Sequence, residues 1–177
     1  MPIVDTCWGP REIGEQPYWH IVGPYGYFNN NVRVGKGALP SVSAGIEGHE
    51  DLQNAHSPYS MARRDDPKEL EFENIRSTAY PDKPSRFKTL YVFDDYSLVE
   101  RACSSWFVGT KKNIHECRII VGAKTHKADT SWLNCIELQW QSFAHQYWSG
   151  TMTANSFPEV LVHGALYFPG WATLPVE

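Results

Sequence analysis

The chain has 177 residues, of which 42% are hydrophobic and 20% charged, an ordinary balance for a globular protein. Its formal net charge of −4 argues against strong nonspecific binding to nucleic acid, although it is compatible with a local basic patch. Because the sequence has no run of about eighteen apolar residues, we expect neither a membrane-spanning helix nor a membrane partner. The length suits a single domain over residues 1–177 with a core of its own.

Two features of the sequence, the N-terminal segment and the cysteines, indicate the cellular compartment. Residues 1–16 carry scattered charges and lack the apolar stretch of a secretory signal, so we expect a cytoplasmic protein. The four cysteines have no CxxC spacing, which suits free thiols in a reducing compartment. A zinc set can be drawn from His115, Cys117, Cys135 and His145. Its spacing matches no common zinc site, so no metal is expected.

The first third of the chain gives few structural signals. Residues 1–16 show no regular pattern, so we expect an irregular N-terminal segment. Residues 17–22, Pro-Tyr-Trp-His-Ile-Val, predict a short strand that the following Gly-Pro pair ends. The segment 23–66 contains Gly and Asn clusters and little periodicity. It predicts a long surface loop of the kind that forms a lid or selects a binding partner.

A helix start is clearer at Asp66. Asp66 suits the N-cap, Pro67 the first helical position, and Glu69 the return bond of a capping box. Phe72 and Ile75 then share one helical face, and the helix should end before Pro81.

The stretch 84–106 predicts a strand that leads directly into a helix. Its β-branched and aromatic run over residues 87–93 is typical of a buried strand. Asp95 can cap the helix that follows, in which Val99, Ala102 and Trp106 recur at helical spacing. A core strand and core helix without a binding role would give the same pattern.

The remaining elements alternate without a regular β-α-β order. We expect a strand at 117–121, a polar loop at 123–131, a helix from 131 to about 147, and strands at 159–162 and 165–168. This order predicts an α+β fold rather than a doubly wound sheet. The sequence has no G-x-G-x-x-G and no phosphate-binding P-loop motif, which argues against those nucleotide sites.

Three stretches, taken in this order, resemble the ADP-ribosyltransferase superfamily. Tyr18-Trp-His-Ile-Val22 is similar to the strand that carries the family's first ligand-facing residue. The run from Leu90 to Ala102 resembles the strand-turn-helix with a nicotinamide-stacking tyrosine in diphtheria-toxin-like and poly-ADP-ribose-polymerase-like enzymes. Pro158-Glu-Val-Leu-Val-His-Gly-Ala-Leu166 resembles the last motif, and DNA-modifying transferases of the DarT kind have a similar Glu-Val-Leu-Val. The Pro84-Ser-Arg86 piece is similar to small phage and bacterial members.

The resemblance implies a split mixed or antiparallel β-sheet core flanked by helices. It also implies a glycosyltransferase that uses NAD as a substrate to ADP-ribosylate a macromolecular acceptor, protein or nucleic acid. Glu159 would be the main catalytic residue, because a carboxylate near the ribose stabilises an oxocarbenium-like transition state. Tyr91 would stack on nicotinamide, and His20 would hydrogen-bond to ribose or amide groups. The remaining NAD-binding positions are Ile21, Ser85, Arg86 and Phe93, with the Arg86 guanidinium suited to phosphate.

Side-chain alternation gives a partial check on these roles. If the three strands lie side by side, His20, Tyr91 and Glu159 should converge on one cleft. The neighbouring apolar residues should then face the core; these are Trp19, Ile21, Leu90 and Val92.

Several alternatives stay open at this point. Phe157 occupies the position two residues before Glu159 where arginine-modifying members have Gln or Glu, which argues against arginine acceptors. Glu159 would also suit a surface strand end, Tyr91 a core position, and Arg86 a surface ion pair. At the level of function, the alternatives are an NAD glycohydrolase and an inactive binding module that docks a partner protein.

Overall fold

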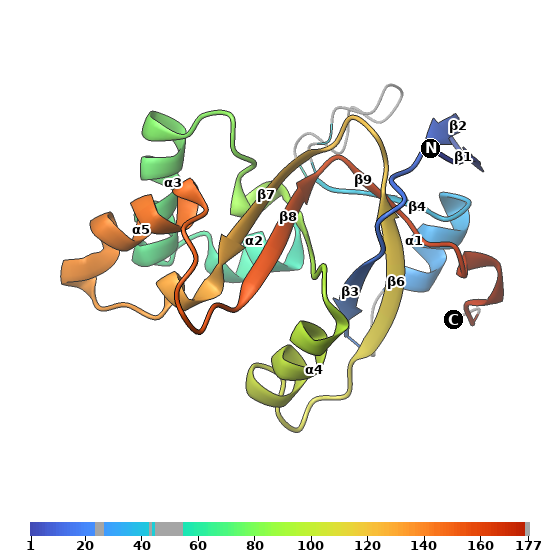
Figure 1. Cartoon of the computed structure of the whole chain (residues 1–177). Coiled ribbons are helices and arrows are strands. Elements are labelled where there is room, and N and C mark those ends of the chain that lie inside the picture. Colours follow the sequence, from blue (N-terminus) through green and yellow to red (C-terminus); the bar gives the residue numbers. More distant parts are fainter. Residues whose placement is uncertain (24–26, 43, 45–54, 176–177) are drawn as a thin grey trace. The chain divides into compact units, whose positions relative to one another are not determined.

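The computed structural model of the protein describes residues 1–23, 27–42, 44 and 55–175 (Figure 1). The chain combines helices with antiparallel strand pairs, which confirms the predicted α+β class. The chain forms two compact units. Unit 1 comprises Met1–Pro40, Tyr91–Ala123 and Gly164–Glu177, and unit 2 comprises Ser41–Leu90 and Lys124–His163. The more specific ADP-ribosyltransferase-like sheet, formed as one domain over residues 1–177, stays a prediction.

Unit 1 is built on a four-stranded sheet in the order β3-β6-β9-β4, with all three neighbouring pairs antiparallel. The strands are β3 (Tyr18–Val22), β6 (Asn113–Ile119), β9 (Ala165–Tyr167) and β4 (Ala38–Pro40). In the β3–β6 pair, His20 lies directly opposite His115, so their side chains share one face of the sheet. A small apolar core gathers Ile13, Ala38, Ile120 and Ala165.

A hairpin and a helix of unit 1 accompany this sheet. A hairpin of β1 (Ile3–Thr6) and β2 (Gly9–Glu12) precedes it, and α1 (Phe28–Val34) leads into β4. Gly37 makes the turn between α1 and β4 with a φ of 92°, in the left-handed region that favours glycine. A Cβ there would lie 2.5 Å from Trp171 and 2.6 Å from Tyr167, so the turn needs glycine for space as well.

Unit 2 pairs two helices through buried aromatic side chains. The helices α3 (Pro67–Ala79) and α5 (Trp140–Ser149) lie side by side (Figure 1). The indole of Trp148 donates a 2.7 Å hydrogen bond to the main-chain oxygen of Phe72, and the Phe72 ring meets the Tyr147 ring edge-on. All three side chains are at most 1% exposed, so this contact is part of the core of the unit.

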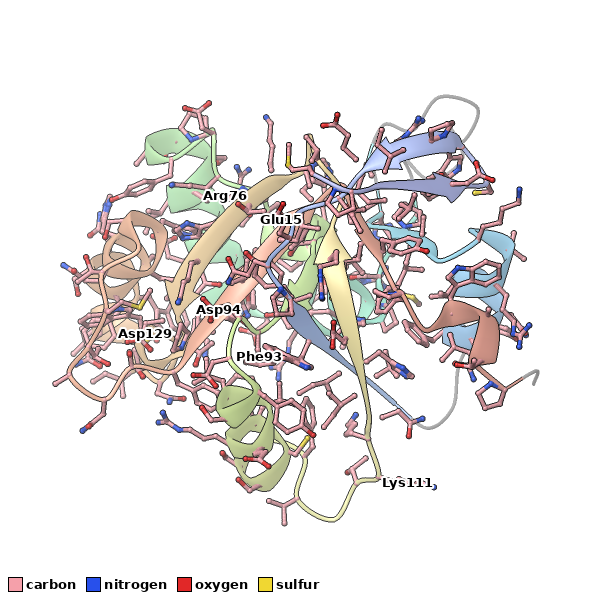
Figure 2. All side chains as sticks on the ribbon, turned by 45° about the vertical axis from the view of Figure 1, so that its right-hand side comes forward. Glu15, Arg76, Phe93, Asp94, Lys111 and Asp129 are labelled. Carbon is pink, nitrogen blue, oxygen red and sulfur yellow. The ribbon has the colours of Figure 1, made fainter. Side chains whose placement is uncertain are left out.

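The other part of unit 2 is an antiparallel pair of β7 (Lys124–Asp129) and β8 (Pro158–His163). Asp129, labelled in Figure 2, ends β7 and is fully buried. Its carboxylate accepts hydrogen bonds from the main-chain nitrogens of Ser131, Thr153 and Phe157 and from the Thr153 hydroxyl. These bonds tie the loop before β8 to the end of β7. They also hold the pKa of Asp129 well below its ordinary value, against the effect of burial.

The two predicted N-caps are confirmed. Asp66 caps α3 by accepting from the main-chain nitrogen of Lys68, and Asp95 caps α4 (Tyr96–Ser105) by accepting from that of Ser97. The predicted strand at 17–22 appears as β3. The two strands near the C-terminus appear as β8 and β9, which belong to different units.

Other boundaries differ from the sequence prediction. Residues 1–16 contain the β1–β2 hairpin, where an irregular segment was expected, and residues 123–131 contain β7, where a loop was expected. The expected loop 23–66 contains α1, β4 and α2 (Pro58–Arg63); its residues 24–26, 43 and 45–54 lie outside the described residues. The expected helix from 131 begins only at Trp140, because two short 3₁₀ helices precede it. Residues 86–88 form a 3₁₀ helix, which leaves β5 only Leu90–Val92.

Candidate functional site

The residues predicted to form the site fall in two neighbourhoods, one in each unit. Those of unit 1 are His20, Ile21, Tyr91 and Phe93, and those of unit 2 are Ser85, Arg86 and Glu159. The structure brings the members of each neighbourhood together. Convergence of His20, Tyr91 and Glu159 on one cleft stays a prediction.

Glu159 lies at the second position of β8, opposite Ala128 of β7, and is 5% exposed. One carboxylate oxygen, Oε1, accepts hydrogen bonds from Arg86 Nη1 at 2.5 Å and from the Tyr147 hydroxyl at 2.7 Å. No residue in the described ranges donates to the other oxygen, Oε2. The carboxylate is therefore anchored through one oxygen, and the alternative of a surface strand end is wrong.

Arg86 is the centre of the unit 2 neighbourhood. It sits on the 3₁₀ helix Arg86–Lys88, whose first turn is capped by the Ser85 hydroxyl accepting from the Phe87 nitrogen. Its guanidinium donates through Nε to Glu69 at 3.1 Å and through Nη2 to the Tyr59 hydroxyl at 2.7 Å. Nη1 reaches both Glu159 and the Tyr147 hydroxyl. With 6% of its side chain exposed, Arg86 forms a buried ion pair, so the surface alternative is wrong.

Two tyrosine rings enclose this guanidinium. Arg86 Cζ lies 5.2 Å from the centroids of both the Tyr59 and the Tyr147 ring, a cation–π distance. The Tyr59 hydroxyl in turn donates to Glu69 at 2.6 Å. Burial raises the pKa of Tyr59 well above its ordinary value, so it remains a protonated donor. We call the five side chains of Tyr59, Glu69, Arg86, Tyr147 and Glu159 the Arg86 cluster.

Glu69 was expected to close a capping box at the start of α3, and that prediction is wrong. Its two carboxylate oxygens accept from Tyr59 and Arg86, while the Asp66 nitrogen donates to the Arg63 main chain. A signal for this role does exist in the sequence. Glu69 lies three residues before Phe72, on the buried face of α3, where a carboxylate requires a charged partner.

His20 has a fixed tautomer in unit 1. Its Nδ1 lies 2.7 Å from the main-chain oxygen of Tyr91, and because a carbonyl only accepts, Nδ1 must carry the proton. Burial lowers the pKa of His20, so the ring is neutral near pH 7 and presents Nε2 as an acceptor. The ring lies 6.0 Å from that of Phe28 and 6.1 Å from that of Phe168.

The residue after β5 pairs with β3 through main-chain hydrogen bonds. Trp19 and Phe93 exchange two hydrogen bonds of 2.9 Å, and Phe93 is labelled in Figure 2. The first two stretches of the resemblance therefore lie against each other. Of the apolar positions expected in the core, Val92 is fully buried, whereas Trp19, Ile21 and Leu90 are half-buried, as is Tyr91.

No pattern in the sequence indicated that His115 lies beside His20. It lies opposite His20, and its ring stacks on Phe28 with centroids 4.7 Å apart. Its Nε2 is buried and has no hydrogen-bond partner among the described residues, and burial lowers its pKa. In the part of the chain that the structure describes, no three His, Cys, Asp or Glu side chains are grouped to hold a metal ion.

Comparison with known proteins places the chain in a family. The profile of the family described as protein of unknown function, DUF2441, matches residues 46–168, more than half of the chain. The chain belongs to the DUF2441 family. The DUF2441 region contains the whole Arg86 cluster and Tyr91, whereas His20 precedes it. A search of curated proteins found no match. No helix within the described ranges is both long and apolar enough to cross a membrane.

Proposed function

We propose that this DUF2441 protein is an NAD-dependent ADP-ribosyltransferase that modifies a macromolecular acceptor. The observation that carries the proposal is the arrangement of the Glu159 carboxylate, which is held through Oε1 and leaves Oε2 to a ligand. The resemblance of its strand to the last motif of the superfamily supports the same residue.

The chemistry needs a fixed negative charge. The bond between the ribose C1′ and the nicotinamide nitrogen breaks with its electron pair leaving on nicotinamide, while the acceptor's nucleophile forms a new bond to C1′ and loses its proton. Positive charge develops on the ribose between these events. In the Arg86 cluster one guanidinium faces two carboxylates, so the formal charge is −1. This excess of negative charge favours a cationic ribose next to Glu159.

The other NAD-binding roles are assigned within the same proposal. His20 Nε2 would accept from a ribose hydroxyl, since its tautomer is set by Tyr91. Tyr91 would stack on nicotinamide, with Ile21 and Phe93 beside it. Ser85 and Arg86 would approach a phosphate, a role that competes with the bonds these side chains already make within unit 2. We expect the protein to act in the cytoplasm, where its four free cysteines would stay reduced.

The decisive experiment compares Glu159→Gln with the unmodified chain in nicotinamide release from NAD. We expect release to fall at least about a hundredfold, because the charge is lost while the shape is kept. Glu73→Gln is the matched control, because Glu73 also pairs with an arginine, Arg76, but is partly exposed at the surface of α3. Full turnover by Glu159→Gln would overturn the mechanism.

Two further measurements separate the alternatives. Calorimetry with NAD distinguishes both enzyme readings from a binding module that docks a protein. Labelled NAD incubated with cell lysate distinguishes transfer from hydrolysis, since only transfer leaves label on protein or nucleic acid. The labelled fraction then names the acceptor class.

A further inference from the structure

We propose that Tyr147 is a positioning residue for Glu159, and that Glu69 keeps Arg86 from neutralising the Glu159 carboxylate. The inference rests on the proposed function, because it assigns roles around the same carboxylate. It also has a readout that does not require activity.

The orientation of the Tyr147 hydroxyl follows from its two partners. Arg86 Nη1 can only donate, so the Tyr147 oxygen accepts from it at 2.5 Å, and the phenol proton is directed to Glu159 Oε1 at 2.7 Å. The ring cannot turn away, because Tyr147 is fully buried against Phe72 and Trp148. Tyr147 thus fixes Oε1 and with it the direction of Oε2.

Glu69 provides the second carboxylate of the cluster. Arg86 bonds to Glu69 through Nε and to Glu159 through Nη1, so its charge is shared between two anions. The Tyr59 hydroxyl links these two side chains, because it accepts a hydrogen bond from Arg86 and donates one to Glu69. If Glu69 were neutral, Arg86 and Glu159 would form an isolated pair with no net charge to stabilise a cation.

Among the described residues, the side chains joined to Glu159 directly or through Arg86 are Tyr59 of α2, Glu69 of α3, Arg86 of the 3₁₀ helix and Tyr147 of α5. The neighbouring strand β7 contributes His126 on the same face. His126 lies on the same face of β7 as Ala128, and its Nε2 donates to the Tyr147 main-chain oxygen. Burial lowers the pKa of His126 and raises that of Tyr59.

The test follows the titration of Glu159 by ¹³C NMR of glutamate carboxyl groups, with its signal assigned by its loss in Glu159→Gln. Tyr147→Phe keeps the ring and removes one donor to the carboxylate, so the midpoint should rise by about one pH unit. Glu69→Gln removes the competing anion, so the midpoint should fall by about one unit. A purely structural role for either residue would change the melting temperature and leave the midpoint in place.

The kinetic readout uses the same variants. For both, kcat for nicotinamide release should fall about ten- to a hundredfold while KM for NAD stays within about twofold. If Tyr147→Phe does not fold, 3-fluorotyrosine at position 147 replaces it. Its more acidic phenol should lower the midpoint.

Each outcome decides one of the two proposals. Unmoved midpoints in both variants, or midpoints that move in the same direction, would overturn the positioning roles. A midpoint that rises in Tyr147→Phe and falls in Glu69→Gln, in a protein that releases no nicotinamide, would support the hydrogen-bond network and contradict the proposed function.

Discussion

In unit 2 the buried side chains of Glu69, Arg86 and Glu159 are paired with one another, whereas in unit 1 the buried ring nitrogen His115 Nε2 has no partner among the described residues. The ions of the Arg86 cluster are held by hydrogen bonds between its members. The histidines of unit 1 instead lie among the rings of Phe28 and Phe168, and desolvation lowers their pKa. The Arg86 cluster of unit 2 is thus a set of ion pairs, whereas burial in unit 1 favours the neutral form of both histidines.

The largest effect is expected where that charge pairing is broken. Arg86→Met leaves two carboxylates buried without a cation, so the free energy of unfolding should fall by about 3–5 kcal/mol. Urea denaturation at pH 7 measures it. In the control, Arg118→Met removes the more exposed pair with Glu116 in unit 1, which should cost less than about 1 kcal/mol. Equal losses would show that burial does not distinguish the two pairs.

A smaller effect is expected at Asp129, the other buried carboxylate of unit 2. Asp129→Asn removes the charge that holds the loop before β8, and we expect a loss of about 2–3 kcal/mol at pH 7. Because the folded-state pKa is lowered, the contribution is present above about pH 3.9, the unfolded value, and declines as the pH falls below it. Asp66→Asn is the control, since Asn caps a helix about as well as Asp. If Asp129→Asn unfolded like the native chain from pH 7 to pH 2, this account would fail.

The smallest effect concerns two histidines and has opposite signs. His126→Phe should destabilise unit 2 by about 1 kcal/mol, because the Tyr147 carbonyl loses its donor, whereas His115→Phe should stabilise unit 1 by about 0.5–1 kcal/mol. Both rings keep their stacking partner, Trp148 or Phe28. Thermal unfolding at pH 7.5 measures the two changes. A loss of stability in His115→Phe would contradict the contrast.

The pH dependence sharpens the same comparison. Since burial lowers the folded-state pKa of His115, its neutral form is favoured by folding. The native protein should therefore lose stability as the pH falls below about 6.5, the unfolded value. His115→Phe should lose less between about pH 6.5 and pH 5, where a free histidine takes up its proton. If the stability of the two proteins fell equally with pH, His115 would not be the cause of the loss.

The sequence predicted the N-caps of α3 and α4, which depend on local hydrogen bonds. The caps at Asp66 and Asp95 were found because each carboxylate acts on a nitrogen two residues away. It failed for β7, Lys-Thr-His-Lys-Ala-Asp, because only the partner strand makes this polar run a strand and buries His126 and Ala128. Glu159 was singled out by resemblance alone. Its anchoring by Arg86 and Tyr147 depends on residues 73 and 12 positions away, which no local pattern reports.

The strand order of unit 1 has a practical consequence for anyone who trims the protein to its DUF2441 region. In the sheet β3-β6-β9-β4, both outer strands come from the first 40 residues, before the region begins at residue 46. A fragment of residues 46–168 would keep β6 and β9 and uncover the outward main-chain groups of each. Such unprotected edges pair readily with other chains. The fragment should therefore aggregate during expression even though it carries the whole Arg86 cluster.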